Sequence, residues 1–187
     1  LLMAFSIPCI ISMLINSVYN IVDQIFIGQG VGYLGNAATN IIFPLVIICT
    51  ALASIVGNGC AAELSLKLGE GKKNEAKKSV GCSITVLIII AILFCIISYL
   101  TLPTLIKLFG CTDSVMPYAL AYGKIIVLGS FFMIIYSGLA SIIRADGSPK
   151  YSMVCLVIGA ILNIILDYIF IMLLNMGVEG GALATVI

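Results

Sequence analysis

A carboxamide and a carboxylate four residues apart, Asn163 and Asp167, are the residues of this sequence best suited to chemistry. They lie in an almost wholly apolar run, residues 151–176, which is long enough to cross a bilayer as a helix of about 20 residues or more. Asp167 is the only charged residue of that run. On a helix, a spacing of four places both side chains on one face. Because an ionisable group at the centre of a bilayer costs about 2.5 to 3.5 kcal/mol on insertion scales, we expect this face to line a bundle interior or a watery cavity.

A second group of polar residues lies near the start of the chain. Asn16, Asn20 and Asp23 follow an i, i+4, i+7 pattern, and Tyr19 is adjacent. The pattern predicts a polar stripe that faces a cavity or a partner helix. Asp23 is alternatively a carboxylate that ends a helix at the membrane interface. Asn16 and Asn20 are candidates either for substrate contact or for hydrogen bonds between helices.

Composition places the chain in the membrane. Hydrophobic residues make up 62% of it, charged residues only 9%, and the mean hydropathy is +1.26. One water-soluble core could not bury that much apolar surface. The sequence starts with Leu rather than Met and stops soon after a last helix begins, so we expect a piece of a longer protein. The opening stretch lacks the basic segment and cleavage site of a signal peptide and is interpreted as a spanning helix.

Uncharged runs separated by charged and glycine-rich clusters predict an all-α, six-helix transmembrane bundle. The expected helices are residues 1–28, 39–66, 79–106, 122–143, 151–176 and 180–187, the last one truncated. The tract from Gln24 to Ala62 has no charge and is too long for one span, so the glycines between residues 28 and 36 are taken as a tight turn.

The basic residues predict the orientation. Seven of the nine Lys and Arg residues fall in the connections after the second and fourth helices: Lys67, Lys72, Lys73, Lys77, Lys78, Arg144 and Lys150. Positive charge marks cytoplasmic connections. At about 1.5 Å per residue, this orientation puts Asp23, Asp167 and Thr185 at similar depth in the outer half of the membrane.

Three stretches are similar in order and spacing to the multidrug and toxic compound extrusion (MATE) transporters. They are residues 144–149 (Arg-Ala-Asp-Gly-Ser-Pro), residues 159–168, which include Asn163 and Asp167, and residues 177–185. The resemblance extends to Pro8, Asn20, Asp23, Gly28 and Gly35 of the first helix and to the Leu68–Gly71 connection. A Gly-Gly pair at 180 and 181, where Gly-Ala is more usual, is a small departure.

The resemblance implies that this chain is the N-terminal lobe of a transporter with twelve helices in two lobes, and that its partner is a C-terminal lobe outside this sequence. It implies that Asp23, Asn163, Asp167 and Thr185 form a proton or Na⁺ site. Pro8 matches a family proline and is a candidate hinge, since proline removes a helical hydrogen bond. A static kink is an equal alternative.

Other chemistries find little support. The glycines at 28–30 and 69–71 do not follow a soluble strand, and no Ser or Thr follows the lysine as a Walker motif requires. The chain has seven cysteines but no CxxC pair and no histidine, which argues against a zinc site and against histidine catalysis within this sequence. We therefore expect no cofactor and no nucleic-acid partner.

Three functions are compared. An antiporter would export small cationic or amphipathic drugs in exchange for H⁺ or Na⁺, because two carboxylates with no basic partner must hold a proton or recruit a cation. A lipid-linked precursor flippase of the same superfamily would carry cationic residues in its cavity, which these helices lack. An intramembrane aspartyl protease would show Tyr-Asp and Gly-x-Gly-Asp patterns, which are also lacking. The sequence favours the antiporter, not an enzyme, as a multi-pass protein of a bacterial plasma membrane.

Overall fold

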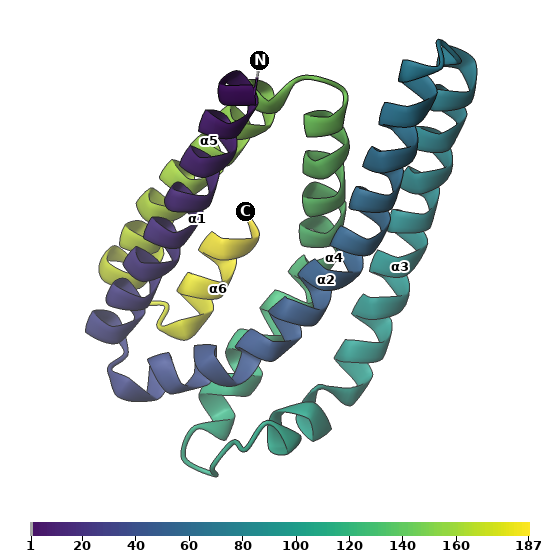
Figure 1. Ribbon diagram of the computed structural model, residues 1–187. Helices are drawn as coiled ribbons and strands as arrows, with labels where there is room; N and C mark the ends of the chain where they lie inside the picture. Colours follow the sequence, from purple (N-terminus) through teal and green to yellow (C-terminus); the bar gives the residue numbers. More distant parts are fainter. Residues whose placement is uncertain (1) are drawn as a thin grey trace.

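The computed structural model describes residues 2–187, with side chains from Ser6 onward, and within that range the chain is helical between short connections and contains no strand. The helices are α1 (Leu2–Gly30), α2 (Tyr33–Gly69), α3 (Lys73–Leu108), α4 (Met116–Ala145), α5 (Pro149–Asp167), a π-helix (Tyr168–Leu173) and α6 (Val178–Val186) (Figure 1).

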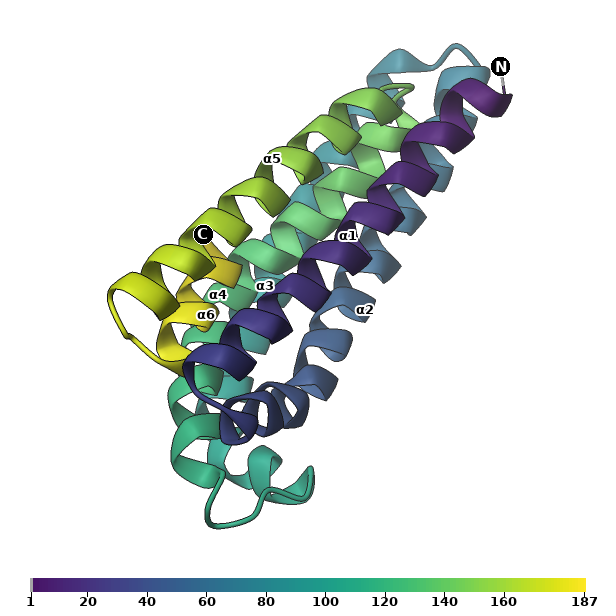
Figure 2. The same ribbon diagram turned by 90° about the vertical axis from the view of Figure 1, so that its left-hand side faces the viewer.

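The helices form two groups joined by α6. α2, α3 and α4 pack side by side, and α1 packs along α5 (Figures 1 and 2). The short α6 lies between them and contacts α4, α5 and α1. The largest buried apolar cluster follows the same plan: it is centred on Ile42, Leu102 and Ile126 and reaches α1 at Ile27 and α6 at Ala182. Burial of these side chains therefore holds α1 and α6 against the three-helix group.

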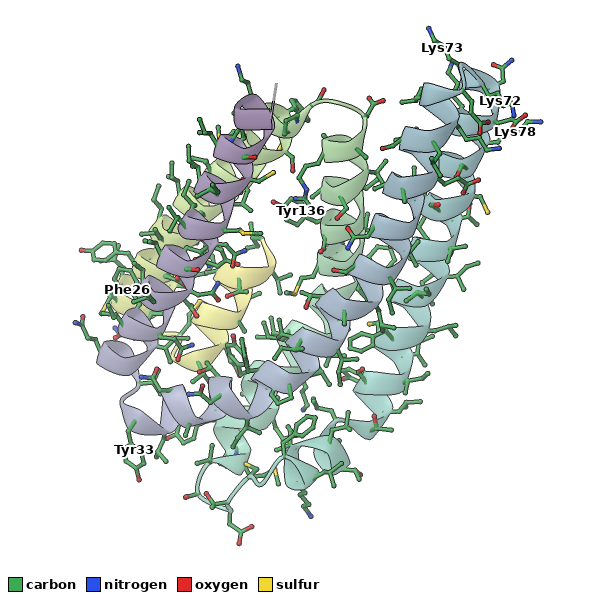
Figure 3. All side chains as sticks on the ribbon, in the orientation of Figure 1. Phe26, Tyr33, Lys72, Lys73, Lys78 and Tyr136 are labelled. Carbon is green, nitrogen blue, oxygen red and sulfur yellow. The ribbon has the colours of Figure 1, made fainter. Side chains whose placement is uncertain are left out.

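Five of the helices are long and apolar enough to cross a membrane, so this is an integral, multi-pass membrane protein. The α2–α3 and α4–α5 connections lie at one end of the bundle, and the α1–α2 and α3–α4 connections lie at the other (Figure 1). Lys72 and Lys73 mark the first of these ends (Figure 3). Two exposed ion pairs occur there, Lys67–Glu75 at 2.7 Å and Lys72–Glu70 at 2.8 Å. Such exposed pairs contribute little to stability.

The helices extend further than the sequence predicts. The second helix runs to Gly69 and the third begins at Lys73, whereas the predicted ends were residues 66 and 79. The fourth covers Met116–Ala145 rather than 122–143. Lys and Glu are good helix formers, so the charges mark the place where a helix leaves lipid and do not end it.

The predicted turn between residues 28 and 36 is wrong in extent. α1 continues to Gly30, and the turn is only Val31 and Gly32, where Gly32 has φ +86°. A positive φ is readily adopted only by glycine. The other glycines of this stretch serve packing. A Cβ on Gly30 would overlap the side chain of Ile171, and a Cβ on Gly28 would lie 2.8 Å from Asn36 Nδ2.

The predicted helix at residues 151–176 is also corrected. The α-helix spans Pro149–Asp167, and the next six residues, Tyr168–Leu173, wind as a π-helix. α6 then starts at Val178 rather than at 180. Hydrophobicity predicts a continuous apolar helix but does not distinguish α from π winding. Single π turns occur frequently at functional sites, and this one begins directly after Asp167.

The orientation can be tested by cysteine labelling in the full-length protein after the native cysteines are removed. We expect Asn74→Cys and Ser148→Cys to react only from the cytoplasmic side, because both are exposed at the end that carries most of the basic residues. Asp113→Cys and Glu179→Cys should react only from outside. Labelling of Asn74→Cys from outside would overturn the orientation.

Candidate functional site

The buried face of α5 is narrow and polar. Ser152, Ala160, Asn163 and Asp167 are buried, while aliphatic side chains such as Ile161 cover the exposed remainder of the helix. The spacing of three and four residues puts the buried positions on one side. Asp167 is 0% exposed and Asn163 is 7% exposed. The sequence thus directs a carboxylate and a carboxamide into the bundle and leaves an apolar surface for lipid.

Asp23 of α1 meets this face. It is 6% exposed, and its carboxyl lies within hydrogen-bonding reach of the Asp167 carboxyl. Two ionised carboxylates cannot donate to each other, so this contact becomes a hydrogen bond only when one of them carries a proton. Both oxygens of Asp167 and Oδ1 of Asp23 have no donor in the structure. Chemically, two such carboxyls can share a proton or bind a cation.

Two further helices complete the cluster. Tyr122 of α4 is buried in the apolar cluster that also contains Ile27, one turn beyond Asp23 on α1, and Ala182, three residues before Thr185 on α6. Thr185 Oγ1 donates to the carbonyl of Gly181 at 2.9 Å, which leaves its oxygen free to accept a hydrogen bond or to coordinate a cation. The cluster thus draws on α1, α4, α5 and α6.

Tyr122 was not among the predicted site residues. The predicted fourth helix starts at residue 122, which makes a tyrosine look like an aromatic anchor at the membrane surface. α4 in fact begins at Met116, so Tyr122 lies almost two turns inside the helix. The usable signal was Pro117, because proline is favoured in the first turn of a helix.

The charge of the cluster is not neutralised by a basic side chain. Within residues 6–187, the ion pairs are the two at the α2–α3 end, and neither involves Asp23 or Asp167. Both polar atoms of the Asn163 side chain are also buried without a hydrogen-bond partner. An unpaired buried charge is strongly destabilising. Carboxylate, carboxamide and hydroxyl oxygens together can hold a proton or a hard monovalent cation such as Na⁺.

Comparison with known proteins shows the family of the chain. The model of the MatE family matches residues 8–169, which is most of the chain. The chain belongs to the MATE family. It is 28% identical to the multidrug export protein MepA of Staphylococcus saprophyticus over all of this chain and 41% of that protein. It is 24% identical to the probable multidrug resistance protein YoeA of Bacillus subtilis over 98% of this chain and 40% of that protein.

A solved MATE structure supports the same assignment. The outward-facing conformation of a multidrug resistance MATE transporter of the MOP superfamily superposes with a TM-score of 0.91 at 29% identity. It covers 97% of this chain, and the match covers 40% of the transporter. The chain therefore spans about two fifths of the length of its MATE relatives and has the fold of one lobe. The predicted family and the predicted all-α membrane fold are confirmed.

The polar stripe predicted on the first helix of this MATE lobe divides into two parts. Asp23 is buried, whereas Asn16 and Asn20 are exposed and bond to each other: Asn20 Nδ2 donates to the Asn16 carbonyl at 2.7 Å and to its Oδ1 at 3.1 Å. Asn20 and Asp23 differ by about 60° around a helix of 3.6 residues per turn, so they lie on either side of the edge of the buried face. Tyr19 is partly buried beside Asn20.

Pro8 lies inside an unbroken helix. It is buried within α1, and Ser12 Oγ donates to the Pro8 carbonyl at 2.8 Å. The proline removes one backbone donor from the first turns of α1. Its role as a hinge stays a prediction.

Proposed function

We propose that the full-length MATE protein is a secondary antiporter that exports small cationic or amphipathic compounds in exchange for H⁺ or Na⁺. One observation carries the proposal: Asp23 and Asp167 are buried against each other without a basic partner. The multidrug export proteins MepA and YoeA, which match the chain over nearly its whole length, support the same class of activity.

The proposed mechanism uses the positions of the three helices that carry these candidate ligands. A proton or cation held by Asp23, Asp167, Asn163 and Thr185 ties α1 and α5 to α6, because its ligands come from all three. Its binding energy then favours the conformation in which these helices are close together. A ligand shifts a conformational equilibrium by the difference between its affinities for the two states. A substrate that binds the other conformation better is therefore released when a cation, driven by its gradient, binds the site again. No covalent chemistry is required, so this is transport rather than enzyme catalysis.

The substrate would meet the part of the lobe that faces the second lobe. Asn16, Tyr19 and Asn20 are the candidate contacts, because they follow the exposed side of α1 next to the carboxylates. The carboxamides of Asn16 and Asn20 can bind a charged group of a substrate, and the ring of Tyr19 can pack against its planar apolar part. Pro8, near the start of α1, is the candidate hinge for moving that helix.

The test is efflux of a fluorescent cationic dye by the full-length protein in proteoliposomes, with a pH gradient and a Na⁺ gradient imposed separately. We expect one of the two gradients to drive export and its collapse to stop it. Dye export that ignores both gradients would contradict cation coupling. Translocation of a lipid-linked precursor without dye export would favour the flippase.

A further inference from the structure

Two isoleucines lie one helical turn beyond the two carboxylates. Ile27 follows Asp23 by four residues on α1, and Ile171 follows Asp167 by four residues, where α5 passes into the π-helix. Side chains four residues apart lie on the same face of an α-helix, and Ile27 and Ile171 are buried at 0% and 2% exposure. Along their helices, both lie on the side of the carboxylates that leads to the α1–α2 connection and the start of α6 (Figure 1).

Ile27 is held between glycines of two neighbouring helices. A Cβ on Gly181 of α6 would lie 2.9 Å from Ile27 Cδ1 and 3.0 Å from Ile27 Cγ1. On α2, a Cβ on Gly35 would lie 2.9 Å from Ile27 Cγ2. The missing side chains of the two glycines therefore leave the space that Ile27 fills between α2 and α6.

Ile171 reaches the same glycine of α6 from the π-helix. Its side chain occupies the position that a Cβ on Gly30 of α1 would take, and its Cδ1 lies 3.5 Å from the position of a Cβ on Gly181. The ends of Ile27 and Ile171 thus meet over Gly181, and we call these two side chains the isoleucine plug. The carbonyl of Gly181 also accepts the hydrogen bond of Thr185 Oγ1 at 2.9 Å, which links the plug to a candidate cation ligand.

The plug separates polar groups from an apolar cluster. One turn back from it, Oδ1 of Asp23, both carboxylate oxygens of Asp167 and both polar atoms of the Asn163 side chain are buried without a hydrogen-bond partner. The plug itself belongs to the largest buried apolar cluster, together with Val178 and Ala182 of α6. A hydrophobic constriction of this kind excludes water and thereby closes a path to ions.

We propose that the isoleucine plug controls the passage of the coupling cation between the outside and the carboxylates. The proposal rests on the antiport function and on the predicted orientation, in which the α1–α2 connection is at the outer side. A cation would have to lose its water to pass two packed isoleucines. The site therefore exchanges with the outside only when α6 moves away from α1 and the π-helix, because the plug closes on Gly181. The same movement displaces Thr185, so opening the path also weakens the hold on the cation.

The experiment measures how fast a cysteine behind the plug reacts from outside. Asn163→Cys is made in the full-length protein after the native cysteines are removed, so that both aspartates are kept. Trimethylammonioethyl methanethiosulfonate, a membrane-impermeant cation, is added to intact cells. We expect slow labelling while the plug is intact and about tenfold faster labelling in Ile27→Thr or Ile171→Thr, because a hydroxyl lets water stay in the constriction.

The matched controls are Ile27→Val and Ile171→Val. Valine has the shape of threonine but no hydroxyl, so both valine variants should label at close to the wild-type rate. Ile25→Thr introduces the same hydroxyl at a 51% exposed position of α1 and should also label at that rate. The threonine variants are expected to fold, since a helical threonine can bond to the carbonyl four residues earlier, as Thr185 does. Protein amount and thermal unfolding are measured alongside.

Labelling at the wild-type rate in both Ile27→Thr and Ile171→Thr would overturn the proposal. An equal acceleration in the valine variants or in Ile25→Thr would also overturn it, because the effect would then be a general loosening of the bundle. Labelling does not depend on which cation drives export. If Ile27→Thr and Ile171→Thr label faster but dye export by the unsubstituted protein ignores both gradients, the plug still bars cations from the carboxylates and the antiport proposal fails. If export follows a gradient and labelling does not change, only the plug is wrong.

Discussion

Asp167→Asn in the full-length protein is expected to reduce gradient-driven export to the level of protein-free vesicles. The substitution keeps the size and shape of the side chain but removes its ability to bind a proton or balance a cation. The protein should still insert and fold, and should be at least as stable as wild type, because a fully buried carboxylate without a basic partner is costly in the bilayer. Lost export in a stable protein is therefore the expected pair of results.

Asp23→Asn should have the same effect, and the double variant should be scarcely worse than either single one. The two carboxyls lie within hydrogen-bonding reach of each other, so they are expected to act as one coupled unit rather than as independent sites. If the loss of export in the double variant equals the sum of the losses in the two single variants, the two carboxyls have separate roles.

The measurement is dye efflux in proteoliposomes under an imposed pH or Na⁺ gradient, with protein amount and thermal stability determined in parallel. Asp113→Asn is the matched control, because it makes the same change at an exposed position in the α3–α4 connection and should export at the wild-type rate. If Asp167→Asn exports normally with unchanged gradient dependence, Asp167 is structural and the shared site is wrong.

The sequence could predict Asp167 because its signal is strong: it is one charge in a long apolar run. The same reasoning found Asp23, and the helical spacing correctly placed Asn163 beside Asp167 on the buried face of α5. Tyr122 escaped because a tyrosine near a helix start has an ordinary interfacial explanation, and only the true start of α4 places it inside. Polarity thus predicts which residues must be buried away from lipid. Whether an aromatic residue joins them depends on where its helix begins, which polarity does not predict.

The presence of each helix could also be predicted from the sequence, whereas its exact ends and its winding could not. Hydrophobicity predicts six apolar segments because each must satisfy its backbone within the membrane. It does not predict that the charged residues 73–78 continue α3, or that Tyr168–Leu173 changes winding. The first detail depends on helix propensity in water, and the second occurs where Ile171 packs closely on Gly30. Neither appears in the hydropathy of the chain.

Glycines show most clearly what sequence alone leaves open. Gly57 and Gly59 stand two residues apart in the same apolar stretch of α2 and look equivalent. In the structure, a Cβ on Gly57 would lie 2.9 Å from the carbonyl oxygen of Gly138 and 3.0 Å from its Cα, whereas a Cβ on Gly59 would meet nothing within 4 Å. Gly57 therefore permits the close approach of α2 to α4, as small residues do at membrane helix interfaces.

Gly57→Leu is accordingly expected to be strongly destabilising, while Gly59→Leu is not. The obstacle at Gly57 is backbone, which cannot rotate away, so the two helices must separate and lose buried contacts on either side of Gly138. Overpacking of this kind costs about 1 to 3 kcal/mol or more, against about 0.5 kcal/mol or less for an exposed substitution.

The measurement is thermal unfolding of the purified full-length variants, together with dye efflux. Because α4 also carries Tyr122, separation of α2 from α4 should displace one wall of the carboxylate site, so Gly57→Leu should lose export as well as stability. Gly57→Ala, with a single methyl, should fall between wild type and Gly57→Leu on both scales. Equal unfolding temperatures for Gly57→Leu and Gly59→Leu would show that α2 and α4 are not in close contact at Gly138. In that case the position of Tyr122 would have to be fixed by α3 and α6.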